Sequence, residues 1–489
     1  MMTTVILFFS VLWIVRIIGN AMSFSHLWWV KEYRWDRMII HLKTPQGKFV
    51  YLLPWKRPRL SPKSVLLTGM LLVALGVIVY FSSLPPLLSL LVADIVSFPL
   101  TFLIVGMLNV PVKLYHDTVI HRAEHLLRSH KSLTVIGITG SYGKTSTKEY
   151  LATLLSSKYA TLKTEASKNA PIGISEVVVS SLRPDHKVFV VEMGAYKKGE
   201  IAYMSSLVRP EIAIVTAINA QHQDLFGSID NTMRAKYELV AGLTGKRIAI
   251  CNADDPRVRT MGEWAKRDGV TVWWYGKNDA LPRGSKTFYA ADIRTDAQGV
   301  RFSCVSGKFS AFVRAEVIGE HQVSNLLAAI AGSVAVGMSL DAAAKAATAI
   351  LPVSHMLQAR KGPHGVTFID DTFNNNPDAA KAALDVLSKQ SGKKILVFQP
   401  MIELGTFAQS SHYDVGAYAG KICDAIILTN DNWKSDFIGG VRSVNPNIPV
   451  SVLSAKSAAT YINEHTMSGD TVLFKSKEAA LVMRRLLPV

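Results

Sequence analysis

Cysteine is scarce in this sequence of 489 residues, which contains only Cys251, Cys304 and Cys423. The three cysteines do not have the close spacing of a zinc or redox motif. A disulfide framework is therefore excluded, and a reducing compartment is expected. We assign all three thiols a structural role.

Acidic residues are also few, with 37 Asp and Glu against 54 Lys and Arg and a formal net charge of +17. Such an excess favours anionic partners, which include nucleotides, phosphosugars, anionic lipids and nucleic acid. The sequence contains no nucleic-acid recognition module, and its basic excess is concentrated beside apolar segments. We therefore expect no nucleic-acid partner.

Charge is almost absent between residues 64 and 112, where Asp94 is the only formally charged side chain. This apolar run is long enough to cross a bilayer twice. We predict a helical hairpin of residues 64–81 and 87–108, with Pro85 and Pro86 at its turn. Residues 4–18 form a weaker first span or an interfacial helix.

Basic residues lie between the first apolar segment and the hairpin, whereas the hairpin turn carries no charge. The positive-inside rule places that basic stretch in the cytoplasm. Both ends of the hairpin then face the cytoplasm, and so does everything after Lys113. We predict a protein of the cytoplasmic (inner) membrane with its catalytic domains in the cytoplasm. The basic residues are Lys31, Arg34, Arg37, Lys43, Lys48, Lys56, Arg57, Arg59 and Lys63.

After Lys131 the pattern changes to short β-branched runs that alternate with amphipathic helices, which is typical of parallel α/β sheets. A break in this pattern lies near Leu351. We predict a membrane-anchoring region at 1–130, a nucleotide-binding central domain at 131–351 and a second, Rossmann-like α/β domain at 352–489.

The clearest motif is "GITGSYGKTSTKEYLATLL", in which a strand leads through a glycine-rich turn into a helix. This arrangement favours a variant phosphate-binding loop, because glycines let backbone N–H groups converge on phosphate oxygens. Lys144 would reach the β and γ phosphates, and Thr145 would hold Mg²⁺. Glu192 ends the strand "VFVVE", where a second metal-holding carboxylate belongs. The residues predicted to bind the nucleotide here are Gly140, Ser141, Gly143, Lys144, Thr145 and Ser146.

Several further motifs follow in order: "EMGAYKKGEI", "TAINAQHQDLFGSIDNTMRAKYEL", "NADDP", "GEHQVSNLLAAIA" and "IDDTFNNNPDAAKAAL". Together with the loop, they resemble the Mur ligase family from about Leu133 to the end of the chain. The resemblance is strongest to the branch that adds D-alanyl-D-alanine to the muramyl tripeptide of cell-wall precursors.

The resemblance implies roles for particular residues. Thr145 and Glu192 would bind the magnesium of ATP, and His222 would bind a second magnesium. Lys236 matches the lysine that many family members carbamylate and use as a metal ligand, so Lys144, His222 and Lys236 are the predicted catalytic residues. Further nucleotide or substrate contacts are implied for Thr164, Asn169, His321, Asn325, Asp371 and Asn374.

The chemistry that this family implies is ATP-dependent ligation of a carboxylate to an amine through an acyl phosphate, with ATP and Mg²⁺ as cofactors. The sequence departs from the family where an arginine is usual: Met356 stands there, and Arg360 lies four residues later. Either Arg360 makes the phosphate contact instead, or that contact is missing. Gln399-Pro400-Met401 and Lys475-Ser476-Lys477 also differ, in the region that handles the incoming amine.

The membrane region occupies the place of the family's soluble sugar-nucleotide-binding domain. The expected partners are therefore ATP, an amino-acid or dipeptide amine donor, an acidic envelope precursor or polymer as acceptor, the membrane, and envelope-synthesis proteins. Two alternatives are a polymer ligase similar to poly-γ-glutamate synthetases and a catalytically inactive, membrane-tethered ATP-binding regulator.

Overall fold

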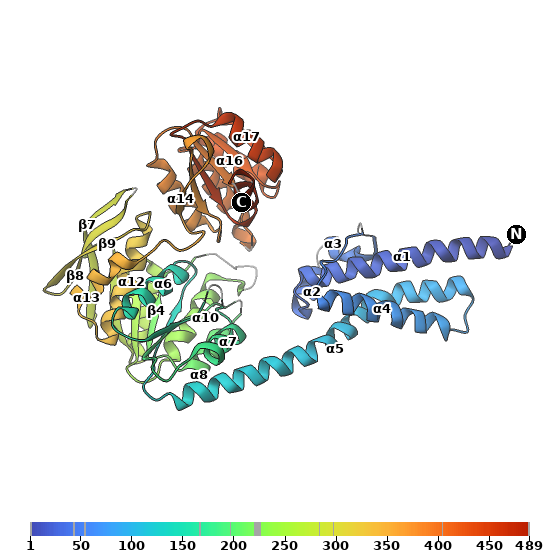
Figure 1. Cartoon of the computed structure of the whole chain (residues 1–489), viewed down its shortest axis with the longest axis horizontal. Helices are drawn as coiled ribbons and strands as arrows, with labels where there is room; N and C mark the ends of the chain where they lie inside the picture. Colours follow the sequence, from blue (N-terminus) through green and yellow to red (C-terminus); the bar gives the residue numbers. More distant parts are fainter. Residues whose placement is uncertain are drawn as a thin grey trace. The chain divides into compact units, whose positions relative to one another are not determined.

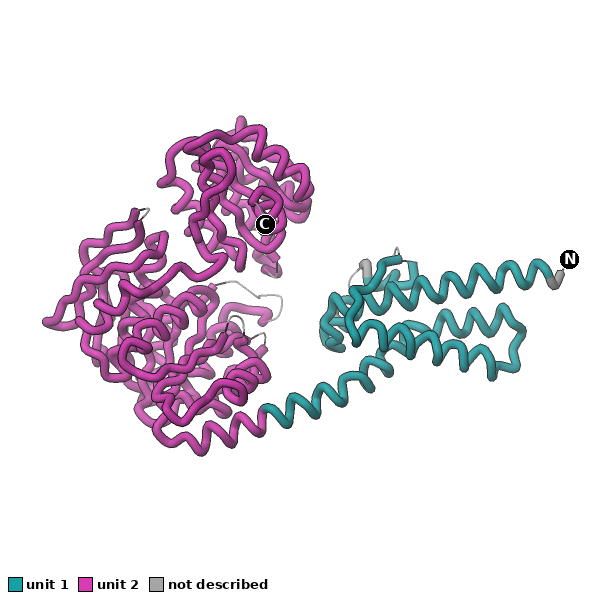
Figure 2. The backbone as a smooth tube through the Cα atoms, viewed as in Figure 1, with its two compact units in different colours: residues 1–119 teal, residues 120–489 magenta. Residues whose placement is uncertain are grey.

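The computed structural model describes residues 2–42, 45–52, 55–165, 168–195, 197–219, 226–282, 284–296, 298–402 and 404–487. The chain divides into two compact units, residues 1–119 and residues 120–489 (Figure 2).

The first unit is helical (Figure 1). Its long helices are α1 (Met2–Val30), α4 (Pro62–Tyr80) and the first part of α5 (Pro86–Ser129). Three short helices lie between α1 and α4, namely α2 (Trp35–Leu42), α3 (Pro45–Lys48) and η1 (Val50–Leu52). Helix α4 begins with a capping box between Ser61 and Ser64 and with Pro62 in its first turn, a typical helix start.

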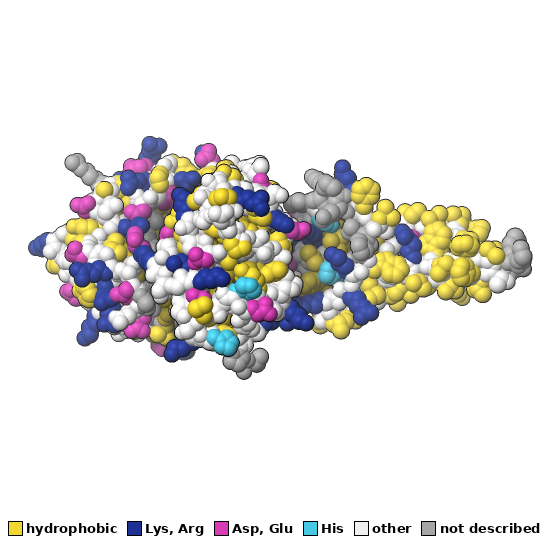
Figure 3. Space-filling view, turned by 90° about the horizontal axis from the view of Figure 1, so that it is seen from above, with side chains coloured by type: hydrophobic (Ala, Val, Ile, Leu, Met, Phe, Trp, Pro, Cys, Tyr) yellow, Lys and Arg dark blue, Asp and Glu magenta, His cyan; other side chains and the backbone are white. Residues whose placement is uncertain are grey.

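Three helices in the described residues, Thr4–Val30, Pro62–Tyr80 and Pro86–Ser129, are long and apolar enough to cross a membrane. Hydrophobic side chains cover most of the visible face of residues 1–119 (Figure 3). A helix that is apolar on its outer as well as its inner face suits a lipid environment.

Helix α1 extends beyond the predicted end at residue 18, because Phe24 and Trp28 are buried and Trp28 Nε1 donates to Thr101 Oγ1 of α5 at 2.7 Å. The predicted hairpin helix likewise continues past residue 108 to Ser129. Its last turns carry Ala123, which is buried in the core of the second unit.

Asp94 is enclosed by three side chains of α1. It accepts hydrogen bonds from Arg16 Nε at 2.8 Å, Asn20 Nδ2 at 2.9 Å and Trp13 Nε1 at 3.3 Å. Asp94, the single acid of the apolar run, therefore has a structural role, because these hydrogen bonds link α1 to α5.

The second unit contains a nine-stranded sheet of order β2-β3-β1-β4-β5-β6-β7-β8-β9. Neighbouring strands from β2 to β7 run parallel, and β7, β8 and β9 are antiparallel. The strands are β1 (Thr134–Thr139), β2 (Thr161–Lys163), β3 (Val188–Glu192), β4 (Ile212–Val215), β5 (Ile248–Asn252), β6 (Thr271–Gly276), β7 (Lys286–Asp296), β8 (Gly299–Ser306) and β9 (Phe309–Ala315).

Helices cover both faces of this sheet, because its strands carry apolar side chains on both faces. One face packs against α7 (Pro171–Ser181), α8 (Glu200–Val208), α10 (Ile229–Ala241) and α11 (Pro256–Arg267). The other packs against α6 (Lys144–Ser156), α12 (His321–Val336) and α13 (Leu340–Ala346), followed by η2 (Ala347–Ala349).

A six-stranded sheet of order β10-β11-β15-β12-β13-β14 follows, in which only β10 is antiparallel to its neighbour. Its strands are β10 (Gln358–Lys361), β11 (Thr367–Asp371), β12 (Lys394–Phe398), β13 (Ala425–Leu428), β14 (Val450–Val452) and β15 (Thr471–Lys475). Its helices are η3 (Pro363–Gly365), α14 (Pro377–Ser388), η4 (Gly405–Phe407), α15 (Ala408–Ala419), α16 (Lys434–Val444), α17 (Ala455–His465) and α18 (Lys477–Leu486).

The predicted fold class, apolar helices followed by two α/β sheets, is confirmed. Strands β6 to β9 were not predicted from the sequence. The two boundaries of the domain prediction stay predictions.

Candidate active site

The glycine-rich loop joins the end of β1 to the start of α6. Gly140 has φ +149° and Gly143 has φ +80°, and a Cβ at either position would overlap a neighbour, Thr216 or Asn325 respectively. Only glycine fits at these two positions, because the backbone is left-handed there and lies close to the end of β4 and to α12. The loop therefore presents its backbone and the first turn of α6 to the same space, as a phosphate-binding loop requires.

Lys144 lies over this loop. Its Nζ donates to the carbonyl oxygens of Gly140 at 2.8 Å and Ser141 at 3.2 Å. Desolvation lowers the pKa of Lys144, and the charge of Glu192 acts in the opposite direction. A cation in this position faces whatever anion the loop binds.

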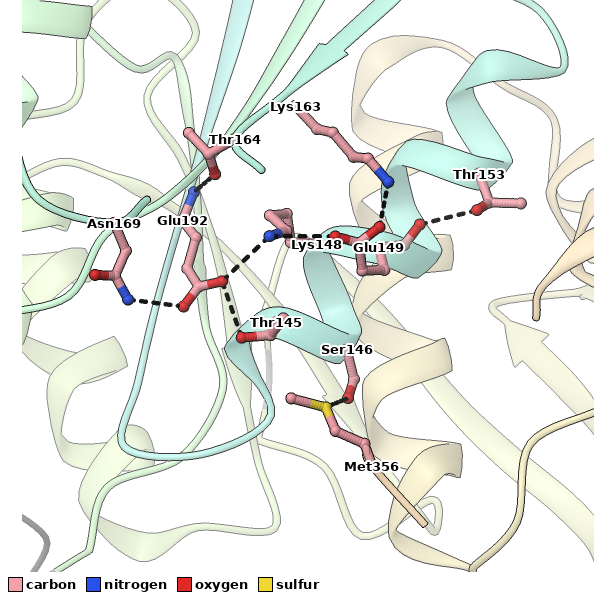
Figure 4. A network of polar contacts seen from close by, with 10 residues as sticks. All are labelled: Thr145, Ser146, Lys148, Glu149, Thr153, Lys163, Thr164, Asn169, Glu192 and Met356. Carbon is pink, nitrogen blue, oxygen red and sulfur yellow. Dashed lines mark hydrogen bonds and ion pairs between the residues drawn. The ribbon is translucent and has the colours of Figure 1, made fainter. Parts of the chain in front are cut away.

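Glu192 is buried at the end of β3 and is contacted from both sides (Figure 4). Thr145 Oγ1 donates to its Oε2 at 3.0 Å, and Asn169 Nδ2 donates to its Oε1 at 3.1 Å. The Thr164 hydroxyl accepts from the Glu192 backbone N–H at 3.0 Å. The structure thus brings together four of the residues predicted from the sequence.

A hydroxyl and a carboxylate that face each other fit Mg²⁺, which is bound through one or two protein oxygens together with phosphate oxygens and water. The described residues include no group of three or more His, Cys, Asp or Glu side chains that could hold a metal by itself. Thr145 and Glu192 therefore suit a metal that arrives with a phosphate ligand.

Lys148 was missed by the sequence analysis. Its side chain is fully buried, and its Nζ lies 3.5 Å from Glu192 Oε2 and 3.2 Å from Glu149 Oε1 (Figure 4). Its spacing from Lys144 could have identified it, because residues four apart on a helix lie on the same face. Lys148 lies one turn beyond Lys144 and beside the same carboxylate.

The predicted second metal site is only partly described. His222 lies outside the described residues. Lys236 is buried on α10, and desolvation, with a contribution from the charge of Lys144, lowers the pKa of Lys236 to about 7. A buried lysine with this pKa is partly neutral at physiological pH. Its carbamylation stays a prediction.

A cavity of about 320 Å³ adjoins the loop and receives residues from both sheets. His321 and Asn325 of α12 line it, as do Asp371, the last residue of β11, and Asn374 in the segment after it. Burial, with the charges of Lys475 and Lys277 adding to the effect, lowers the pKa of His321 to about 4, so this imidazole is neutral at pH 7.

The second sheet closes this cavity with a buried ion pair. Lys475 Nζ lies 2.5 Å from Asp371 Oδ2 and donates to the Asn374 carbonyl at 2.8 Å. Asn219 Nδ2, which follows β4, donates to Asp378 Oδ2 at 2.9 Å. The Asn219–Asp378 contact joins the two α/β sheets at the cavity.

Arg360 is not among the residues that line the cavity. Its Nη2 lies 3.2 Å from Asp370 Oδ2, a carboxylate that His355 Nδ1 also contacts at 2.9 Å. Met356 does line the cavity, with its sulfur 3.6 Å from Ser146 Oγ. The phosphate contact predicted for Arg360 stays a prediction.

Other lining residues were missed by the sequence analysis. Asn252 and Asp254 belong to the "NADDP" motif, so the signal was present although no role was assigned. Tyr275 and Lys277 come from β6 and the turn after it, where no comparable motif is present.

Two family models match the chain: the Mur ligase middle domain over residues 138–332 and the Mur ligase glutamate ligase domain over residues 357–478. A UDP-N-acetylmuramoyl-tripeptide–D-alanyl-D-alanine ligase from Mycobacterium tuberculosis is 30% identical over 380 residues, which is 71% of each protein. The chain belongs to the Mur ligase family.

Other relatives carry related names. The ligase of the same name from Escherichia coli is 34% identical over 297 residues, which cover 60% of this chain and 63% of that protein. The chain thus spans less than two thirds of that relative. A crystal structure of MurF from Acinetobacter baumannii has a TM-score of 0.68 at 29% identity, covering 76% of this chain and 80% of that one.

A MurF ligase from Thermotoga maritima, solved in complex with ADP, has the same fold with a TM-score of 0.65 at 23% identity. It covers 76% of this chain and 83% of its own. The predicted Mur ligase resemblance is confirmed. The predicted enzyme class, an ATP-dependent, ADP-forming amide ligase, and the predicted cofactors ATP and Mg²⁺ are those of the chain's Mur ligase relatives.

Proposed function

We propose that this chain joins the carboxylate of an acidic cell-envelope precursor to an amine at the expense of ATP. The observation that carries the proposal is the Thr145–Glu192 pair beside the glycine loop, in which Thr145 lines a cavity that Asp371 and Lys475 of the second sheet also line. A phosphate loop alone would suit many nucleotide-binding proteins. The Mur ligase relatives make peptidoglycan precursors by this class of reaction.

In the proposed reaction, an oxygen of the substrate carboxylate attacks the γ-phosphorus of ATP, the bond to the β-phosphate oxygen breaks, and ADP leaves. The amine nitrogen then attacks the acyl carbon of the acyl phosphate. The carbon–oxygen bond breaks, inorganic phosphate leaves, and the nitrogen loses a proton. The product is an amide.

The residues of the chain support these steps by charge and position. Lys144 and the loop N–H groups stabilise the negative charge on the transferred phosphoryl group. Thr145 and Glu192 would hold Mg²⁺, which would supply positive charge to the phosphates. The contact of Asn219 with Asp378 of the second sheet helps to exclude water, which would hydrolyse an acyl phosphate.

We further propose that α1, α4 and α5 anchor the chain in the cytoplasmic membrane with residues 120–489 in the cytoplasm. Three sufficiently long apolar helices and the basic residues between α1 and α4 support this topology. A membrane-bound ligase suits an acceptor that is lipid-linked or part of an envelope polymer. Partner proteins of envelope synthesis would act at the same surface.

The second candidate is the membrane-tethered ATP-binding regulator. Met356 at the cavity, together with the pairing of Arg360 to Asp370, favours it, because the usual cationic contact to phosphate is missing there. The polymer ligase differs from the main proposal only in its acceptor and in repeated addition.

The deciding experiment measures phosphate release by the detergent-solubilised chain with Mg-ATP, over a panel of amines with and without muramyl-peptide or lipid-linked acceptors. We expect release that requires both an acceptor and an amine, and an amide product by mass spectrometry. Lys144→Ala should abolish it, whereas Lys246→Ala, at an exposed lysine, should not. ATP binding without turnover for every pairing would instead support the regulator.

A further inference from the structure

Four charged side chains form a connected cluster beside the glycine loop, where α6 faces the ends of β2 and β3 (Figure 4). Lys148 Nζ lies 3.5 Å from Glu192 Oε2 and 3.2 Å from Glu149 Oε1. The other oxygen of Glu149 is paired with Lys163, the last residue of β2. Positive and negative charges therefore alternate from Lys163 to Glu192, and the cluster is balanced as a whole.

Burial increases from one end of this cluster to the other. The Lys163 side chain is 42% exposed and that of Glu149 is 23% exposed, whereas Lys148 is fully buried and Glu192 is 3% exposed. A buried ion pair rarely adds stability, because the cost of removing both charges from water offsets their attraction. Stability alone thus does not explain a lysine at the inner end of the cluster.

Both carboxylate oxygens of Glu192 have protein partners. Its Oε2 accepts from Thr145 Oγ1 at 3.0 Å and faces Lys148, and its Oε1 accepts from Asn169 Nδ2 at 3.1 Å. A metal cation that approached this carboxylate by itself would meet the ammonium of Lys148 in a buried setting, where like charges repel strongly. A metal bound to a triphosphate brings compensating negative charge with it. The arrangement therefore favours a metal that arrives with the nucleotide over a free one.

We propose that Lys148 is a positioning residue that balances the charge of Glu192 and thereby disfavours divalent metal that comes without a nucleotide. This inference rests on the metal-binding role proposed for Thr145 and Glu192. Lys148 is not among the residues that line the nucleotide cavity, so it acts through Glu192. The site would then accept metal as the ATP complex, and the carboxylate would not be occupied ahead of the nucleotide.

The test titrates Mn²⁺ into the nucleotide-free, detergent-solubilised full chain at constant pH, with the free ion measured by electron paramagnetic resonance. Lys148→Met should tighten Mn²⁺ binding about 10-fold or more, because a like charge beside the carboxylate is removed. Lys163→Met is the matched control: it removes the same charge from the exposed end of the cluster and should change the Kd less than about 2-fold. Damage to a site weakens metal binding, so a merely structural role of Lys148 would not produce a gain in affinity.

Two further variants make the result independent of how well Lys148→Met folds. Lys148→Met combined with Glu149→Gln removes one charge of each sign, keeps the cluster balanced and should also tighten Mn²⁺ binding. Adding Glu192→Gln to Lys148→Met should abolish the gain, because the carboxylate that binds the metal is then neutral.

Unchanged or weaker Mn²⁺ binding in the double variant would overturn the inference and leave the ligase proposal standing. A gain that survives Glu192→Gln would also overturn it, because the metal would then bind elsewhere. Absence of phosphate release from wild-type chain with every amine would instead count against the ligase proposal. The Mn²⁺ titration requires no substrate, so it decides the role of Lys148 in either case.

Discussion

Glu192 is the single residue on which the proposed chemistry depends most. Glu192→Gln keeps the shape and can still accept from Thr145, but it removes the charge that would hold Mg²⁺. We expect phosphate release to fall about 100-fold or more at saturating ATP, and higher Mg²⁺ to restore only part of it. The measurement is a magnesium titration of initial rates.

Glu149→Gln is the matched control for Glu192, because Glu149 is the other carboxylate beside the buried Lys148. It removes a charge from the same lysine without touching the Thr145 pair. A loss of rate in Glu149→Gln as large as in Glu192→Gln would mean that the buried lysine, and not the metal, explains the effect.

The buried amine of Lys236 predicts a pH dependence of stability. Its pKa is lowered to about 7 in the folded chain, so the unfolded chain binds the proton more tightly. The destabilisation is therefore complete below pH 7 and is relieved as pH rises toward the ordinary lysine value. Lys236→Met should raise the unfolding temperature most at pH 6 to 7, with a shrinking gain toward pH 9.

This comparison uses thermal unfolding of the full chain in detergent and CO₂-free buffer, with the exposed Lys246→Met as reference. An increase in unfolding temperature that is the same from pH 6 to pH 9 would show that burial does not neutralise Lys236.

At the scale of elements, alanine variants can distinguish two requirements for glycine in the loop between β1 and α6. One is the backbone strain of a positive φ, and the other is close contact with α12. Gly143 and Gly199 both precede a helix with positive φ, but only a Cβ at Gly143 would meet Asn325, since nothing lies within 4 Å at Gly199. Both alanine variants should lose about 1 kcal/mol of stability through backbone strain, and Gly143→Ala should lose more because of its contact with Asn325. Only Gly143→Ala should also weaken ATP binding, by about 10-fold, measured by titration calorimetry. Equal ATP affinities in the two variants would contradict the assigned role of the loop.

At the scale of the whole molecule, the proposed topology can be tested by cysteine labelling. The three natural cysteines are buried, so their background reaction is low. A membrane-impermeant maleimide should label Ser83→Cys, in the hairpin turn, in intact bacterial spheroplasts. Lys131→Cys should react only after permeabilisation. Labelling of both sites before permeabilisation, or of neither afterwards, would refute the proposed orientation.

Much of this architecture could be predicted from local patterns. The parallel strands β1, β3, β4, β5, β11, β12, β13 and β15 were visible as short β-branched runs, and the glycine loop was visible because its residues are contiguous. The antiparallel strands β7 to β9 were not predicted, because their half-exposed alternation is a weaker signal than a fully buried run.

By itself the sequence determined the phosphate loop, the apolar helices and the order of the Mur ligase motifs, since each depends on neighbouring residues. Only the tertiary structure decided which distant side chains meet. Lys475 and Asp371 are 104 positions apart, and Thr145 and Glu192 are 47 apart. The partner of Arg360 is Asp370, and a buried partner of Lys148 is Glu192. Contacts of this kind follow from how strands pair and helices pack, which no local pattern specifies.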